Sequence, residues 1–286
     1  MKNIIFHIKK NFIKFLKFFG LKIIKINRDR SNLDRLHKIF LKDISLPIII
    51  DVGANVGQTI LRFKNLNNKC FIHSFEPVEN DYKVLQKKFN NNKSIFLNNC
   101  ALGEKTYKKK LYINNLSGSS SFNKLTPNTE WIQKRSFTNK VDPREVFQCS
   151  ANCDVITLDD YCEKNFIKKI DVLKIDAQGY EDKILEGAKK IIKAKIVNYI
   201  ELEIIFNNVY EKKLSFLHIE KNLIPFGYEL FAISNPGNYY DDYIFQVDVI
   251  YFNRAALTQE KIYIYEELNK RFKYNENFKK YWFYSR

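Results

Sequence analysis

The sequence predicts an α/β protein built on a mostly parallel β-sheet with helices on both faces. Short, continuous apolar segments alternate along the chain with segments of helical periodicity, which is the pattern of repeated strand–helix–strand units. The apolar segments show no regular polar alternation, as expected of parallel strands that are buried on both faces. The 286 residues, 45% of them hydrophobic, are enough for one large core.

The expected elements are defined by these two kinds of pattern. Runs rich in Ile, Val, Leu and Phe predict strands at 47–52, 70–75, 94–97, 110–113, 154–158, 171–176, 196–203, 228–233 and 244–252. Apolar residues at helical spacing predict helices at 31–41, 81–89, 181–192, 214–223 and 258–274, a helical stretch that follows residue 59 and runs through 63, and a further helix beginning at 159.

Residues 114–148 form the one long stretch without a clear period. The stretch is rich in Ser, Thr and Asn. A loop of this length inside a compact domain is usually a functional lid or is disordered. We expect residues 117–148 to shape the pocket for the substrate.

The N-terminal segment is basic and amphipathic. Residues 1–26 interleave apolar residues with lysines and contain no uncharged stretch long enough to span a membrane. Such a helix can lie on an anionic membrane surface or pack on the domain, and a liposome flotation assay with and without residues 1–27 separates the two. The expected organisation is an extension at 1–46, one α/β domain at 47–255, and a C-terminal helix and aromatic tail at 256–286.

The chain carries a formal net charge of +16, from 48 Lys and Arg against 32 Asp and Glu. This excess fits either an anionic partner or a Lys-rich surface with no dedicated partner. The charge is spread along the whole chain, which favours the second interpretation, and no nucleic-acid partner is expected. The odd number of five cysteines and the lack of a secretory signal predict reduced thiols in a cytoplasmic protein.

The strongest motif is a glycine-rich turn directly after the first predicted strand. The turn reads Asp-Val-Gly-Ala-Asn-Val-Gly from Asp51 to Gly57, and a helix follows. Glycines let a backbone approach a ligand closely at the carboxyl end of a parallel strand. No Gly-Lys-Ser/Thr follows, so the turn is not a P-loop. Glu76 ends the next predicted strand, where a carboxylate can accept hydrogen bonds from ribose hydroxyls.

Six blocks in order resemble the FkbM-type methyltransferases, a branch of the class I S-adenosylmethionine-dependent enzymes. The resemblance covers roughly residues 48–252. Its blocks are Ile50–Gly57, Phe75-Glu76-Pro77, Asn99–Gly103, Ser119–Ser121, Thr157–Tyr161, and Leu173–Glu181 with Leu185, Gly187 and Ala188. It implies a Rossmann-like sheet of seven strands, mostly parallel with one antiparallel edge strand, and an N-terminal helical extension.

The resemblance also implies a site for S-adenosyl-L-methionine. The first turn would hold the methionine portion, Glu76 the ribose, and Asn99 to Ala101 would line the adenine, while Asp51 would anchor the amino group. Cys100 departs from the small, unreactive residue expected there. The candidate cofactor-binding residues are Asp51, Gly53, Ala54, Asn55, Gly57, Gln58, Thr59, Glu76, Pro77, Asn99, Cys100, Ala101 and Asp176.

Catalysis is expected at the end of the strand at 171–176. Lys174 and Asp176 share a face of this strand, and Glu181 begins the next helix. A general base must remove the proton of an attacking hydroxyl, and Asp176 is the first candidate, with Glu203 as the alternative. Lys174 could lower the pKa of Asp176, bind a substrate anion, or form a structural ion pair with Asp176.

Two acidic residues and the histidines have other expected roles. Asp159 and Asp160 are expected to cap the helix that follows them, although a divalent metal shared with Asp176 is conceivable. No metal site is assigned. His73 lies within a predicted strand and is expected to be a core residue.

The leading functional hypothesis is an O-methyltransferase that acts on a sugar hydroxyl of a surface polysaccharide, glycolipid or secondary metabolite. This substrate class comes from the resemblance. One alternative is an RNA or protein methyltransferase that uses the basic surface. A second is a non-catalytic scaffold that binds the cofactor. The sequence gives no expectation for the oligomeric state.

Overall fold

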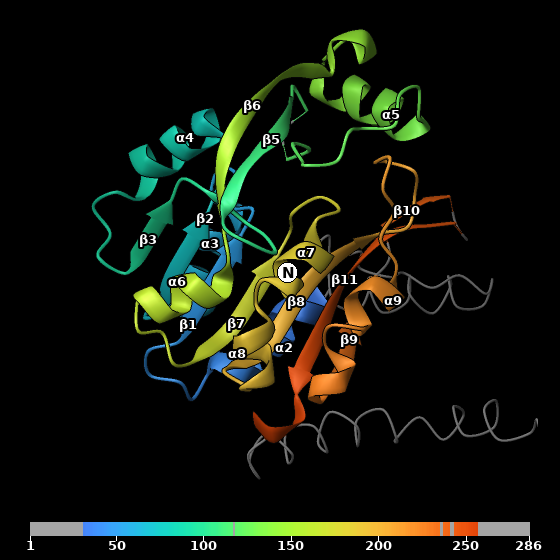
Figure 1. Cartoon of the computed structure of the whole chain (residues 1–286). Helices are drawn as coiled ribbons and strands as arrows, with labels where there is room; N and C mark the ends of the chain where they lie inside the picture. The colour runs from blue at the N-terminus through green and yellow to red at the C-terminus, as the bar shows by residue number, and fades with distance from the viewer. Residues whose placement is uncertain (1–30, 117, 235–236, 241–242, 257–286) are drawn as a thin grey trace, which may run out of the picture.

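The computed structural model describes residues 31–116, 118–234, 237–240 and 243–256. The main sheet has the order β10-β11-β8-β7-β1-β2-β3, and β9 pairs with β11 beside β10 (Figure 1). Its strands are β1 Ile48–Val52, β2 Phe71–Phe75, β3 Ile95–Asn98, β7 Ile170–Ile175, β8 Val197–Ile205, β9 Tyr228–Ile233, β10 Gly237–Tyr240 and β11 Tyr243–Asn253.

Five neighbouring strands of this sheet, β3, β2, β1, β7 and β8, are parallel. The predicted fold class, a mostly parallel Rossmann-like sheet, is confirmed. One detail differs, because the antiparallel strand β11 does not form the edge. It lies between β8 on one side and β9 and β10 on the other. The sequence pattern defines where a strand lies but not which strands flank it.

Helices cover both faces of the sheet. They are α2 Ser31–Leu41, α3 Gln58–Leu66, α4 Glu79–Phe89, α6 Leu158–Lys164, α7 Glu181–Glu186, α8 Lys189–Lys193 and α9 Phe216–Glu220, and the 3₁₀ turns η2 Ile224–Phe226 and η3 Arg254–Ala256 complete the periphery. The helix predicted at 214–223 is shorter, because it gives way to η2 at Pro225.

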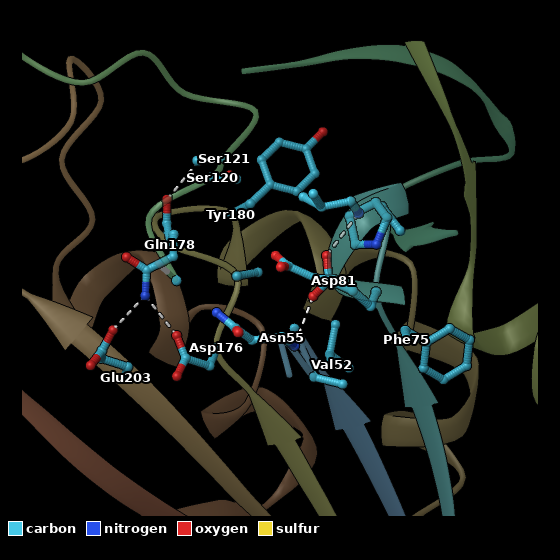
Figure 2. A pocket seen from close by; sticks show the side chains of 18 of the residues that line it. Val52, Asn55, Phe75, Asp81, Ser120, Ser121, Asp176, Gln178, Tyr180 and Glu203 are labelled. Atoms are coloured by element: carbon cyan, nitrogen blue, oxygen red, sulfur yellow. Dashed lines mark hydrogen bonds between the residues drawn. The ribbon is translucent and has the colours of Figure 1, made fainter. Parts of the chain in front are cut away.

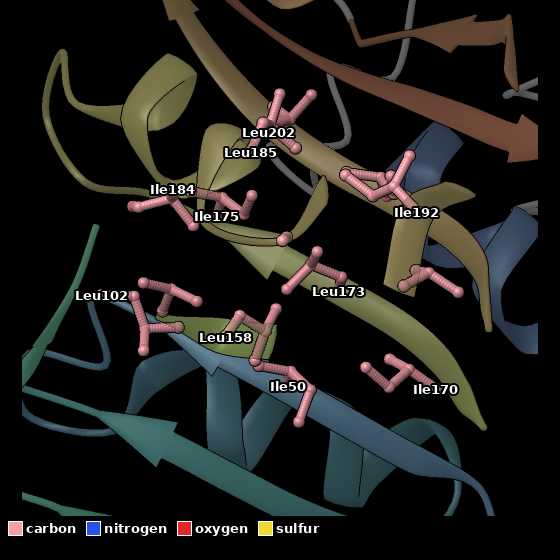
Figure 3. Close-up of a cluster of buried hydrophobic side chains, with 14 of the residues drawn as sticks. Ile50, Leu102, Leu158, Ile170, Leu173, Ile175, Ile184, Leu185, Ile192 and Leu202 are labelled. Atoms are coloured by element: carbon pink, nitrogen blue, oxygen red, sulfur yellow. The ribbon is translucent and has the colours of Figure 1, made fainter. Parts of the chain in front are cut away.

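Alternate residues of each strand enter two separate cores. Ile50 and Leu173 pack with α6, α7 and α8 in the larger core, which Figure 3 shows. Their neighbours Ile49 and Val172 pack on the opposite face with α2 and α3. Because side chains alternate across a strand, one apolar run supplies both cores.

The described part of the N-terminal extension, α2, is integrated into the domain. Leu33, Phe40 and Leu41 are buried against Phe63 of α3 and Tyr199 of β8. The expectations for residues 1–26 and 258–274 lie outside the described residues.

A second, three-stranded sheet forms an arm on the main domain. Strands β4 Ala101–Leu102, β6 Phe147–Ile156 and β5 Tyr107–Asn114 pair in this order, and the segment between β5 and β6 carries α5 Glu130–Asn139 and η1 Pro143–Glu145. Figure 1 shows β5 and β6 extending from the main sheet with α5 at their far end. The expectation of an aperiodic loop at 114–148 is therefore wrong for α5, η1 and the start of β6.

The cap predicted for α6 is also wrong. Thr157 caps α6, since its side chain accepts a hydrogen bond from the Asp160 N–H. The Asp159 carboxylate instead accepts the N–H groups of Lys190 and Ile191 at 2.9 and 3.0 Å, so it caps α8. A carboxylate can stabilise the N-terminus of any helix that lies close to it in the fold. The distance along the sequence therefore does not show which helix Asp159 caps.

Candidate active site

A cavity of about 970 Å³ lies at the carboxyl ends of β1, β2, β7 and β8. The main sheet and the helices α3, α4 and α7 supply one side of the cavity, and the arm and the segment after β5 supply the other. The lining residues of the first side are Val52, Gly53, Ala54, Asn55, Gln58, Thr59, Arg62, Phe75, Glu76, Pro77, Val78, Asp81, Asp176, Ala177, Gln178, Tyr180, Ile184, Glu203, Ile205, Phe245 and Gln246. Those from the arm and its loop are Ala101, Leu102, Leu111, Gly118, Ser120, Ser121, Phe122, Trp131, Arg135 and Asn139.

The glycine-rich turn is held tightly between its neighbours. The N–H groups of Gly53 and Ala54 both donate to the Phe75 carbonyl at 3.0 Å. Gly53 has φ +81°, and a Cβ placed on it would lie 2.0 Å from the Asp176 carbonyl oxygen. Only glycine fits this close approach, which brings the first turn directly against the end of β7.

Glu76 anchors the next turn. Its carboxylate accepts the Val78 N–H at 2.7 Å and the Asn55 N–H at 2.8 Å, so it joins the ends of β1 and β2. Burial raises the pKa of Glu76 to about 7 against the effect of these two bonds. The carboxylate also lines the cavity, where it can accept further hydrogen bonds from a ligand.

At the end of β7, a glutamine joins two carboxylates. Gln178 Nε2 donates to Asp176 Oδ1 at 2.7 Å and to Glu203 Oε2 at 2.9 Å, as Figure 2 shows. Gln246 Nε2 donates to the other oxygen of Glu203 at 2.6 Å. Burial and the Asp176 charge raise the pKa of Glu203 well above its usual range. The Asp176 side chain is 28% exposed, whereas Glu203 is buried.

Three predicted site residues lie beneath the cavity surface and do not line it. Lys174 is fully buried with its Nζ 3.4 Å from Asp176 Oδ2, which is the ion pair weighed from the sequence. Asp51 is also buried and accepts a hydrogen bond from the Ser74 hydroxyl at 3.2 Å. Glu181 accepts the N–H groups of Ala177 and Gly179, at 2.9 and 3.2 Å, and so shapes the turn after β7. Because these side chains do not line the cavity, we do not expect them to contact a ligand directly.

Burial changes the ionisation of these groups. It raises the pKa values of Asp51 and Glu181 to about 7. Burial alone would lower the pKa of Lys174, but the charges of Asp176 and Glu201 raise it instead. The lysine therefore stays charged and balances the carboxylates around it.

The predicted adenine-side residues divide in the same way. Ala101 lines the cavity, whereas Asn99 and Cys100 do not, and neither does Gly57 of the glycine-rich turn. Asn99 donates through its amide to the Glu76 carbonyl at 3.0 Å and so supports the turn. Gly57 has φ +95° and faces Phe89 of α4.

Several lining residues were not singled out from the sequence. Trp131, Arg135 and Asn139 come from α5, and Asp81 comes from α4. The sequence signal for the three residues of α5 was Thr129, an N-cap residue that marks the start of this helix. Asp81 begins the helix predicted at 81–89, but it was not assigned to the site.

Arg62 of α3 was also missed, and it is the centre of a buried ion-pair network. Its guanidinium contacts Asp34 of α2 through Nε and donates to both oxygens of Glu201, at 2.7 and 3.1 Å. His37 Nε2 lies 2.5 Å from Glu201 Oε2. Burial alone would raise the pKa of Glu201, but Arg62 and His37 hold it well below its usual range. In the chain, Arg62 lies 28 residues from Asp34 and 139 residues from Glu201, so no local sequence pattern links the three.

Two further observations concern the described residues only. No three His, Cys, Asp or Glu side chains in the described ranges are placed to share a metal ion. Among the helices that the structure describes, none has the length and apolar character needed to cross a bilayer.

The strand order and the cleft above the first glycine-rich turn define a class I methyltransferase fold. The chain belongs to the FkbM methyltransferase family, because the family model described as "Methyltransferase FkbM domain" matches residues 51–230. The protein is therefore a methyltransferase.

Two curated relatives are methyltransferases. The chain is 23% identical over 191 residues to 2-O-methyltransferase NoeI of Sinorhizobium fredii, covering 65% of this chain and 74% of NoeI. It is 28% identical over 166 residues to methyltransferase sdnD of Sordaria araneosa, covering 50% of this chain and 61% of sdnD.

Among solved structures, the similarity is low. Magnesium protoporphyrin IX methyltransferase from Synechocystis, solved with bound SAM, shares 11% identity and a TM-score of 0.39, covering 85% of this chain and 91% of that one. An rRNA methylase from Streptococcus thermophilus shares 11% identity and a TM-score of 0.41, covering 76% and 94%.

Proposed function

We propose that this protein is an S-adenosyl-L-methionine-dependent O-methyltransferase whose acceptor is a sugar hydroxyl. The observation that carries the proposal is the position of Asp176. Its partly exposed carboxylate lines the same cavity as the turn after β1 and Glu76, and Gly53 packs directly on its backbone. A cofactor held by the turn and an acceptor held by the arm would meet beside this carboxylate.

The residues present fit the cofactor. Glu76 presents an acceptor for ribose hydroxyls, the Gly53–Asn55 backbone lines the cavity, and a volume of about 970 Å³ accommodates the cofactor with an acceptor. When bound, S-adenosyl-L-methionine supplies a methyl group on a positively charged sulfur.

The protein would contribute proximity and a base. Asp176 would accept the proton of the attacking hydroxyl, while Gln178 and Lys174 hold its carboxylate in place. Glu203 is less suited, because both of its oxygens already accept amide hydrogen bonds and its raised pKa favours the protonated form.

The cavity wall supports a sugar acceptor. Trp131, Tyr180 and Phe122 line it together with Ser120 and Ser121. Aromatic faces pack against the apolar face of a pyranose, and hydroxyls serve its polar edge. The similarity to a 2-O-methyltransferase agrees with transfer to oxygen. A surface polysaccharide, a glycolipid or a glycosylated secondary metabolite are the acceptor classes we propose.

Two experiments test the proposal. Calorimetric titration measures binding of S-adenosyl-L-methionine, and a transfer assay then measures the movement of a labelled methyl group to a panel of methyl glycosides and oligosaccharides. Glu76→Ala should abolish measurable binding, whereas the exposed Glu79→Ala on α4 should bind as the native protein does. Asp176→Asn should keep cofactor affinity within about threefold and lower turnover by roughly 100-fold or more. If Asp176→Asn retains the native turnover, Asp176 is not the general base. If S-adenosyl-L-methionine does not bind to the native protein, the proposed cofactor dependence is refuted.

A further inference from the structure

We propose that Arg62 binds the carboxylate at the amino-acid end of the cofactor, and that Asp34 and Glu201 hold the guanidinium in position for it. The inference rests on the proposed dependence on S-adenosyl-L-methionine. It assigns a specific contact to a residue that the glycine-rich motif does not contain.

The first observation is the charge of the cavity wall. Four carboxylates line it, those of Glu76, Asp81, Asp176 and Glu203. A ligand that carries its own carboxylate therefore needs a cation on the wall, since the ionised members of this set, Asp176 among them, would repel it. Two arginines line the cavity, Arg62 and Arg135.

The second observation separates the two arginines by position. Arg62 lies on α3, the helix that begins at the end of the glycine-rich turn, and it is four residues after Gln58, so both face the cavity from one side of the helix. Its charge also acts on Asp51 at the end of β1. Arg135 lies on α5 in the arm, on the acceptor side.

The third observation is the state of the guanidinium. A guanidinium has five N–H donors, and the contacts with Asp34 and Glu201 use three of them. The Arg62 side chain is 13% exposed and lines the cavity, whereas the Glu201 side chain is 1% exposed. Two N–H donors of the guanidinium are not used by Asp34 or Glu201. A planar guanidinium fixed on two sides is preorganised for a carboxylate on the third.

The network also explains a feature of the extension. Asp34 comes from α2, which precedes the family-matched segment at 51–230. The helix therefore does more than cover a hydrophobic face, because it holds a residue of the cofactor site. Asp34 and Glu201 are positioning residues in this arrangement.

Two ligands that differ in one group test the inference. Decarboxylated S-adenosylmethionine keeps the adenosine, the sulfonium and the amine and lacks only the carboxylate. The native protein should bind S-adenosyl-L-methionine at least about 10-fold more tightly than the decarboxylated form, as expected for a charge-assisted pair. Calorimetry gives both affinities without any turnover.

The variant must not leave a buried charge unpaired. Arg62→Gln combined with Glu201→Gln removes both charges together. This variant should bind the decarboxylated ligand within about threefold of the native protein, and its preference for the carboxylate should fall to about threefold or less. The matched control combines Arg144→Gln with Asp142→Asn, an exposed ion pair on η1, and should keep the native preference.

The outcomes separate the two claims. A native preference retained in the double variant, or equal native affinities for the two ligands, would overturn the role of Arg62 and leave the proposed function standing. No native binding to either ligand would instead refute the proposed function. If the double variant does not fold, Arg62→Lys, which keeps the charge and loses the planar fork, should lower the preference several-fold, and an unchanged preference there would overturn the inference.

Discussion

At the scale of single residues, Gln178 connects the two carboxylates of the candidate site. Its amide nitrogen bridges Asp176 and Glu203, and its amide oxygen accepts the Tyr210 hydroxyl at 2.8 Å. The residue adopts φ +55°, in the left-handed region. Ser121 contributes by donating to the Gln178 carbonyl at 2.7 Å. This turn fixes the direction of the Asp176 carboxylate.

Gln178→Asn tests that role without adding backbone strain, because Asn tolerates the left-handed region. The shorter amide cannot bridge both carboxylates, so turnover should fall roughly 10-fold through loss of orientation, with cofactor affinity unchanged within about twofold. Steady-state kinetics and calorimetry measure the two effects. Gln133→Asn, on the exposed face of α5, serves as the control. A fall in cofactor affinity that matched the fall in turnover would contradict a positioning role.

Sequence reasoning identified residues at this scale only where a local motif marks them. Gly53, Glu76 and Asp176 stand at strand ends that follow recognisable patterns, and the structure brings all three to the cavity. The same patterns also included Asp51 and Glu181, which point below the cavity surface. A motif fixes which residues lie at a turn, but side-chain direction there depends on packing from distant segments.

At the scale of elements, α5 is the part of the arm that gives the cavity its acceptor side. Trp131 and Ile132 are buried in a small core with Val146 and Tyr210, and Trp131 also lines the cavity. Phe137 lies on the same helix and is 89% exposed. The helix therefore presents one aromatic ring to the cavity and another to solvent.

This difference provides a matched pair of variants. Trp131→Leu should raise the KM for the acceptor roughly 10-fold by removing a stacking surface, with cofactor affinity unchanged. Phe137→Leu should leave both quantities unchanged. Acceptor-dependent initial rates and calorimetry give the two measurements. Equal effects of the two substitutions on KM would rule out a direct acceptor contact by α5.

Most elements of the main sheet were predictable from sequence, whereas the arm was predicted only in part, by the strands expected at 110–113 and 154–158. Strands such as β1 and β7 are buried on both faces, so their apolar runs are unmistakable. Helix α5 buries Trp131, Ile132 and Ser136, and a serine at a buried position breaks the apolar period. Strand β6 extends to ten residues with Cys149 and Ser150 exposed, because its hydrogen bonds with β5 define it rather than burial.

At the scale of the whole molecule, the cleft concentrates buried carboxyl groups whose ionisation is linked to stability. Burial raises the pKa values of Asp51, Glu76 and Glu181 to about 7, and burial together with the Asp176 charge raises that of Glu203 well above its usual range. Burial acts oppositely on His73, lowering its pKa to about 4. The topology creates this concentration, because parallel strands bring all their carboxyl ends to one edge.

The sign of the resulting pH dependence follows from linkage. Asp51, Glu76 and Glu181 lose their protons near pH 4 in the unfolded chain and near pH 7 in the folded one, so the folded state binds more protons between these values. Their stabilising contribution is complete below pH 4 and is lost as the pH rises through 7. The raised pKa of Glu203 acts in the same direction. His73 acts in the opposite sense, since its contribution grows between about pH 4 and 6.5 and is constant above.

The cofactor-free protein should therefore unfold at a lower temperature at pH 8 than at pH 6.5, by about 4 °C or more for a domain of this size. Differential scanning calorimetry at constant ionic strength measures the shift. Glu181→Gln keeps an oxygen to accept the N–H groups of Ala177 and Gly179 and removes one of the four titrations, so it should reduce the decline. A melting temperature that rose between pH 6.5 and 8 would show that these carboxyl groups ionise normally in the fold.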